Sequence, residues 1–171
     1  SADGDVSIDA TDGSSSASVS AWVSVYLGSY NSTPSTLTVS DTLSATGDIY
    51  VESSSSIDLA AVDAGSTFGI GQNFGDWPTD TELWGTVSAD TIDIDLAGAL
   101  TAYEAISATN DINIDNDSGS VSLVSLDAGG SIYVGKDYSP STFEASDILS
   151  ADGGVYLDAA ETISLTGLAA G

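Results

Sequence analysis

Four oxygen-bearing side chains lie at matching places in two similar segments, residues 92–95 (IDID) and 112–115 (INID). If the two segments are neighbouring strands, Asp93 lies beside Asn113 and Asp95 lies beside Asp115, all on one outward side. Carboxylate and amide oxygens are the ligands that Ca²⁺ prefers in proteins. We therefore predict a Ca²⁺ site at Asp93, Asp95, Asn113 and Asp115. The alternative is a pair of hydrated surface carboxylates, one of them with a raised pKa.

Tyrosines occupy the middle of four other short apolar segments, at Tyr26, Tyr50, Tyr133 and Tyr156. We expect them to point outward and to stack in two pairs. Exposed aromatic rings on a flat strand face favour a contact surface for another subunit or a glycan. The alternative is ordinary cross-strand pairing that stabilises the sheet. Trp77 and Trp84 flank the loop around Pro78, and we expect both to pack against it.

The composition excludes several classes of function. The chain has 26 Asp and Glu residues, one Lys, no Arg, no His and no Cys, and its formal net charge is −25. Binding to nucleic acid or to anionic membrane surfaces is not expected, because phosphate and anionic lipid attract Lys and Arg. Membrane insertion is not expected either, because no apolar run is long enough to span a bilayer. Without His or Cys the commonest general base and nucleophile are missing. We expect a non-enzymatic, extracellular or cell-surface protein, and a mature or excised segment of it.

An opening such as Ser-Ala-Thr-Gly-Asp recurs, with variants, at residues 1, 44, 88, 107 and 150. Repetition at fixed spacing indicates stacked structural units. We divide the chain, as a single domain 1–171, into repeat units 1–43, 44–87, 88–106, 107–149 and 150–171.

Eight short apolar-x-apolar segments follow these openings or fall between them. They begin at residues 6, 25, 49, 68, 92, 112, 132 and 155, in steps of 19 to 24. Alternation with β-branched residues is typical of half-buried strands. The spacing predicts an all-β fold: a right-handed parallel β-helix, or β-solenoid, of about seven turns spanning about 35 Å. Its core would be ladders of Ile, Val, Leu and Ala.

The residue after each apolar segment alternates between an acid and glycine in successive turns, except at Asp95 and Asp115. Stacked carboxylates repel one another. We interpret the glycines as separating them, so that Gly71→Asp or Gly135→Asp lowers the melting temperature at low salt. Pro34, Pro78 and Pro140 are expected to mark protruding corner loops. Two triplets, at 31–33 and 116–118, match the N-glycosylation pattern.

The strand at 45–51 (ATGDIYV) and the turn at 127–134 (DAGGSIYV) resemble repeats of filamentous-haemagglutinin-like and autotransporter-type bacterial surface proteins. The resemblance extends over nearly the whole chain. It implies a secreted, elongated, right-handed β-helix that serves as a stalk, an adhesin or a fibre.

These observations lead to two hypotheses of function. The first is a structural building block of an extracellular or cell-surface fibre, which binds copies of itself end to end because no cap is recognisable at either end of the sequence. The second is an adhesin segment that binds glycans or host surfaces through the proline loops and the outer tyrosines.

Overall fold

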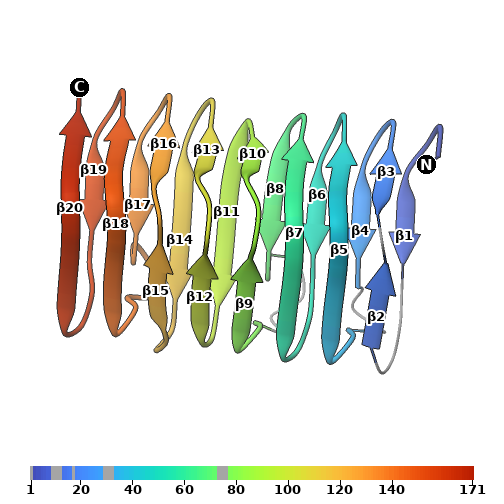
Figure 1. Cartoon of the computed structure of the whole chain (residues 1–171), viewed down its shortest axis with the longest axis horizontal. Coiled ribbons are helices and arrows are strands. Elements are labelled where there is room, and N and C mark those ends of the chain that lie inside the picture. Colours follow the sequence, from blue (N-terminus) through green and yellow to red (C-terminus); the bar gives the residue numbers. More distant parts are fainter. Residues whose placement is uncertain (1, 9–12, 17, 29–32, 73–76) are drawn as a thin grey trace.

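The computed structural model describes residues 2–8, 13–16, 18–28, 33–72 and 77–171. These residues form twenty β-strands and contain no helix (Figure 1). All the strand pairings between them are parallel, and the strands form two sheets on opposite sides of one core. The prediction of an all-β parallel solenoid is confirmed. Among the residues described, no helix reaches the length and hydrophobicity needed to span a membrane.

One sheet, here named the short-strand sheet, receives one strand of three to six residues from each coil. The middle residue of each strand points outward and its neighbours point into the core, as the apolar-x-apolar pattern predicts. In spatial order the sheet contains β1 (Val6–Ile8), β4 (Val25–Leu27), β6 (Ile49–Val51), β8 (Thr67–Ile70), β11 (Thr91–Leu96), β14 (Ile112–Asn116), β17 (Ile132–Val134) and β19 (Val155–Leu157).

The register of the short-strand sheet is the one that the repeats predict. Each predicted strand start pairs with the start in the next coil, without a shift at any of the seven interfaces. The column formed in this way is Val6, Val25, Ile49, Phe68, Ile92, Ile112, Ile132 and Val155.

The other sheet, here named the long-strand sheet, receives either one long strand or two short strands from each coil. The long strands are β5 (Thr36–Ala45), β7 (Ser56–Ala64), β18 (Thr142–Ala151) and β20 (Thr162–Ala170). The paired short strands are β2 (Gly13–Ser16) with β3 (Val19–Ala21), β9 (Asp80–Leu83) with β10 (Val87–Ala89), β12 (Ala99–Ala102) with β13 (Ile106–Ala108), and β15 (Ser120–Leu123) with β16 (Leu126–Ala128).

The coil is right-handed. In Figure 1 the long-strand sheet runs upward in front and the short-strand sheet runs downward behind, while the chain advances from right to left. The described strands make eight coils, one more than the predicted seven or so, and coils spaced by about 4.8 Å stack into a short rod.

The core is one continuous cluster of aliphatic side chains, with Phe68 and Phe143 among its largest members. Burial of each aliphatic side chain contributes about 1.5–3 kcal/mol, and each coil depends on its neighbours for that burial. Thr81 is an exception to the apolar pattern. It lies between Ile57 and Leu100 in an inward column, and its hydroxyl has no hydrogen-bond partner among the described residues.

A polar ladder holds the corner before the short strands. Asp5 and Asp48 each accept a hydrogen bond at Oδ1 from a backbone amide of the next coil, those of Ser24 and Thr67, both at 3.0 Å. Asp111 accepts one from the Ser131 amide at 2.7 Å. Such bonds satisfy amides that point out of the strand ladder at the turn. The Asp before the strand is therefore structural in these three repeat openings, whereas the openings at 88 and 150 have Thr91 and Gly154 at this position.

Glycine is required at the opposite corner for a steric reason. Gly28, Gly71 and Gly135 have φ of +86°, +69° and +76°, in the region that disfavours other residues. A Cβ on any of them would lie 2.4–2.5 Å from the carbonyl oxygen of the aligned residue in the next coil. The hypothesis that these glycines separate stacked carboxylates did not consider this requirement of the backbone.

The three prolines lie at the ends of the segments that were predicted to be corner loops, and residues 29–32 and 73–76 of these segments lie outside the described residues. Pro34, Pro78 and Pro140 are buried where the chain rejoins the coil. Their carbonyl oxygens accept backbone hydrogen bonds of 2.8–3.0 Å from the next coil. A proline fits here because its own missing N–H is needed by no neighbour, while its carbonyl continues the ladder.

Candidate functional site

One outward column of the short-strand sheet contains the four predicted tyrosines and two of the four predicted Ca²⁺ ligands, Asp93 and Asn113. One residue from the middle of each strand contributes to it. In order, the column is Ser7, Tyr26, Tyr50, Gly69, Asp93, Asn113, Tyr133 and Tyr156. Two tyrosine pairs therefore lie on either side of the predicted Ca²⁺ ligands.

The tyrosines stack in the two predicted pairs. The ring centroids of Tyr133 and Tyr156 are 4.9 Å apart with an interplanar angle of 4°. Those of Tyr26 and Tyr50 are 5.8 Å apart at 20°. A Cβ on Gly69 would approach the Tyr50 ring to 2.7 Å, so glycine leaves room for that ring. Cross-strand pairing is thus present, and the role of the tyrosines as a contact surface stays a prediction.

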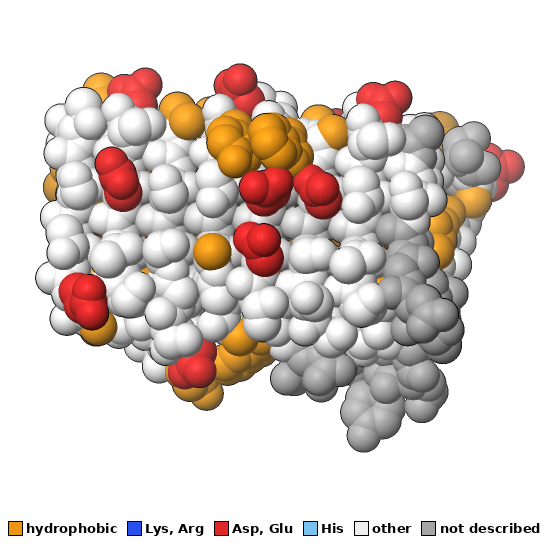
Figure 2. All heavy atoms as spheres, turned by 60° about the horizontal axis from the view of Figure 1, so that its bottom comes forward, with side chains coloured by type: hydrophobic (Ala, Val, Ile, Leu, Met, Phe, Trp, Pro, Cys, Tyr) orange, Lys and Arg blue, Asp and Glu red, His pale blue; other side chains and the backbone are white. Residues whose placement is uncertain are grey.

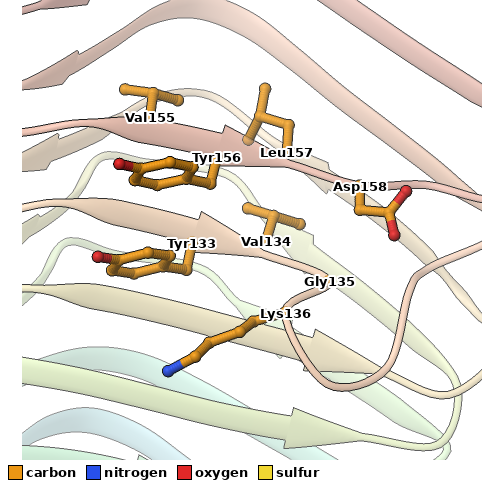
Figure 3. A pocket seen from close by; sticks show the side chains of 8 residues that line it. All are labelled: Tyr133, Val134, Gly135, Lys136, Val155, Tyr156, Leu157 and Asp158. Carbon is orange, nitrogen blue, oxygen red and sulfur yellow. The ribbon is translucent and has the colours of Figure 1, made fainter.

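A hollow of about 610 Å³ opens around Tyr133 and Tyr156 at the last coils (Figure 3). In Figure 3 the two rings lie parallel on the same side, and the Lys136 side chain extends beneath Tyr133. The Lys136 Nζ is 5.4 Å from the centroid of that ring, within the range of a cation–π contact. Asp158 lies on the other side of the hollow, where Ser139 donates a hydrogen bond of 2.8 Å to its Oδ2. The hollow thus has the one Lys of the chain and two stacked phenol rings on one side and a carboxylate on the other.

The four predicted Ca²⁺ ligands come together as expected. They line a hollow of about 200 Å³, together with Gln72, Ile94, Lys136 and Asp137. Asn113 donates a hydrogen bond of 2.6 Å to Asp93 Oδ1. Asp115 is buried, and its Oδ1 accepts hydrogen bonds from the backbone amides of Asp137 and Tyr138 at 2.9 and 3.3 Å. Asp93, Asn113 and Asp115 are thus all engaged in hydrogen bonds within the protein.

Burial, together with the nearby carboxylates of Asp115, Asp93 and Asp137, raises the pKa of Asp95 to about 6, and a hydrogen bond with Gln72 opposes this shift. This agrees with the alternative of stacked surface carboxylates, one with a raised pKa. Within the described ranges no three His, Cys, Asp or Glu side chains are grouped closely enough to hold a metal ion. The Ca²⁺ site stays a prediction without support from this geometry.

The two glycosylation triplets have different outcomes. Asn31 lies outside the described residues, as does Asp9 of the acid and glycine column. Asn116 is fully buried. Its Nδ2 donates to the Gly98 carbonyl, and its Oδ1 accepts from the amide of Gly119 at 2.6 Å. Asn116 is the last residue of β14, and a side chain held in this way does not fit a glycosylation site.

Trp77 and Trp84 do not act together against the Pro78 loop. Trp77 makes an edge contact with Tyr138, with ring centroids 4.8 Å apart. Trp84 instead lies on the outer face of the long-strand sheet, stacked on Tyr103 at 4.3 Å and 12°. The sequence analysis did not predict the pairing of Trp84 with Tyr103. Their spacing of 19 residues, equal to the shortest coil step, is the signal that identifies it.

Comparison with protein-family models, with curated proteins and with solved structures found no match to this chain. The resemblance to filamentous-haemagglutinin-like and autotransporter-type proteins stays a prediction based on the repeats.

Proposed function

We propose that this protein is a structural, non-enzymatic building block of an extracellular or cell-surface fibre, in which copies add end to end. The strongest support is the apolar surface of the last coil. Ile163, Leu165 and Leu168 are 43%, 37% and 54% exposed. Their partners in the preceding coil, Phe143, Ala145 and Leu149, are buried. Side chains of one column thus change from buried to exposed because no further coil covers β20 among the described residues.

Coil addition is the contact that this fold makes at every interior interface. At each one, backbone hydrogen bonds and apolar columns continue from one coil to the next. The first coil offers a matching edge, where Val6 and Ile8 are only partly buried although Val25 and Leu27 above them are buried. A second copy placed with β1 on β19 would pair Val6 with Val155 and Ile8 with Leu157. Contacts of this head-to-tail type produce open filaments.

The test is assembly of the 171-residue chain as a function of concentration, followed by sedimentation velocity and negative-stain microscopy. We expect rods that lengthen with concentration and have an axial repeat of about 38 Å, from eight coils of about 4.8 Å. The double variant Ile163→Lys/Leu168→Lys places two charges on the exposed edge and should remain monomeric.

A matched control is Ser40→Lys/Ser120→Lys, which adds the same charge at exposed positions of β5 and β15, away from both edges. This control should assemble like the parent chain. Parent chains that stay monomeric at every concentration, or edge variants that assemble as well as the control, would contradict the proposal.

A further inference from the structure

The Trp84 and Tyr103 pair is the largest exposed aromatic group on the long-strand sheet, and the fibre proposal does not use it. Trp84 follows β9 and Tyr103 follows β12, and the last residues of these strands, Leu83 and Ala102, are register partners in adjacent coils. Trp84 is 51% and Tyr103 43% exposed. The two side chains therefore stand out from the sheet as one stacked unit, named here the aromatic pair.

Carboxylates of the preceding coil fix both rings. Trp84 Nε1 donates a hydrogen bond of 2.6 Å to Asp58 Oδ1, and the Tyr103 hydroxyl donates one of 3.4 Å to Glu82 Oε1. Asp58, Asp80 and Glu82 also line a hollow of about 170 Å³ beside the pair. Rings held by such bonds lose little side-chain entropy on binding a ligand. Figure 2 shows large hydrophobic side chains directly beside acidic ones, and no Lys or Arg side chain is visible in this view.

A second hollow of about 250 Å³ lies on the other side of Tyr103, toward the following coils. Thr101, Ser122 and Ser146 contribute hydroxyl groups to it, and Glu144 contributes a carboxylate. Trp84 covers the face of the Tyr103 ring toward the preceding coil, and the opposite face borders this hollow. A free ring face with hydroxyl and carboxylate groups beside it is the usual arrangement of a site that selects by stacking and by a few polar contacts.

We propose that the aromatic pair and its two hollows bind an oligosaccharide that carries protonated amino groups. The C–H face of a sugar ring packs on the exposed ring faces, and sugar hydroxyls bond to Ser122, Ser146 and Thr101. Charge selects the class of sugar. Four carboxylates line the two hollows and no Lys lines either of them. An acidic sugar is repelled, and a neutral sugar gains no ion pair. An ammonium group gains charge-assisted hydrogen bonds and a cation–π contact.

The probe is a β-linked glucosamine hexamer, titrated at mildly acidic pH and physiological salt and followed by tryptophan fluorescence and calorimetry. The comparison ligand is the N-acetylated hexamer, which has the same rings without the charge. We expect the glucosamine hexamer to bind at least about tenfold more tightly than the acetylated hexamer. The double variant Trp84→Ala/Tyr103→Ala should reduce its affinity by a similar factor, and Trp84→Phe should restore part of it.

A control for general attraction to an acidic protein compares two variants that remove the same charge. Asp58→Asn/Glu82→Gln changes the site, whereas Asp127→Asn/Asp152→Asn changes exposed positions outside both hollows. Only the first should weaken binding. Equal binding of the acetylated hexamer, equal weakening by both variants, or full affinity without the two rings would each overturn the proposal. Because the monomeric edge variant Ile163→Lys/Leu168→Lys keeps the aromatic pair, the same titration on it separates this site from fibre assembly.

Discussion

Both sheets of the solenoid consist of parallel strands, but only the long-strand sheet contains shifts in the register between paired strands. The short-strand sheet passes through seven interfaces without a shift. The long-strand sheet shifts register between Val39 and Thr42 and between Ala145 and Ile148. Trp84 and Tyr103 lie in the corresponding stretches of other coils, between the two halves of the sheet. A bulge adds residues that have no place in the core and turns their side chains outward.

The comparison indicates that backbone contacts determine the register of one sheet and side-chain packing stabilises the other. The short-strand sheet ends in a corner that only glycine fits in three of its coils, so its register depends on backbone contacts. The long-strand sheet depends on large inward side chains such as Phe143, and it tolerates local insertions. Surface chemistry can therefore vary on the long-strand sheet without disturbing the stack.

The largest expected effect is loss of a core side chain of the long-strand sheet. Phe143 is fully buried between Val121 and Ile163 in its column. Phe143→Ala should lower the free energy of unfolding by about 3–5 kcal/mol, because it removes buried apolar surface and leaves a cavity. Urea denaturation measures it. Glu144→Ala, at the adjacent outward position, should change stability by no more than about 0.5 kcal/mol. Equal losses in the free energy of unfolding for the two variants would show that side-chain packing does not stabilise this sheet.

The corresponding test of the short-strand sheet is Gly71→Ala. A left-handed φ disfavours alanine by about 1–2 kcal/mol, and the contact of its Cβ with the Asp95 carbonyl adds about 1–3 kcal/mol. We expect a similar fall in melting temperature at low and high salt. Gly4→Ala, with no atom within 4 Å of the added Cβ, is the control and should be nearly neutral. If Gly71→Asp is harmful only at low salt and Gly71→Ala is tolerated, charge separation is the better explanation.

A smaller effect of opposite sign is expected at Thr81. Its buried hydroxyl lacks a partner among the described residues, and its neighbours in the column are Ile57 and Leu100. Thr81→Val keeps the shape and removes the unsatisfied group, so the free energy of unfolding should rise by about 1–2 kcal/mol. Chemical denaturation provides the measurement. A loss of stability would indicate that the hydroxyl is satisfied in solution, for example by a trapped water molecule.

The smallest effect concerns Asp95 and depends on pH. Its pKa of about 6 in the folded protein exceeds the ordinary 3.8, so the folded state binds the proton more tightly. The charged form is destabilising, and this penalty is complete above about pH 6 and disappears as the pH falls toward 3.8. Asp95→Asn should raise the melting temperature at about pH 7 and leave it unchanged at about pH 4. A gain of the same size at both values would exclude titration of Asp95 as the cause.

The repeats predict the short-strand sheet well because its physics is local. An apolar-x-apolar segment can bury two side chains only on one face, and recurrence at coil spacing brings equivalent residues together. All eight predicted strand starts, from Val6 to Val155, lie in one column for this reason. The predicted tyrosine pairs and the cluster around Asp95 follow from the same register.

Features that depend on contacts between coils could not be predicted from this pattern. Asp115 is held by amides of the loop in the next coil, and Asn116 is buried by bonds to neighbouring glycine residues. Pro34 resembles a loop residue in sequence but is buried by a neighbouring coil. The partners of Asp115 and Pro34, and the Gly98 carbonyl that Asn116 Nδ2 contacts, lie about one coil away in the chain, whereas the bond of Asn116 with the Gly119 amide is local.

The amino-acid sequence alone therefore determined the coil: its period, its register and the acidic, apolar-cored character of the protein. Only the tertiary structure decided which polar groups are engaged and which stay free. It placed the Asp95 carbonyl against Gly71, engaged the predicted calcium ligands in hydrogen bonds and stacked Trp84 on Tyr103. The physical reason is that the alternation of apolar and polar residues along the chain determines which side chains are buried. A hydrogen bond or a ring contact depends instead on the exact path of the backbone between coils.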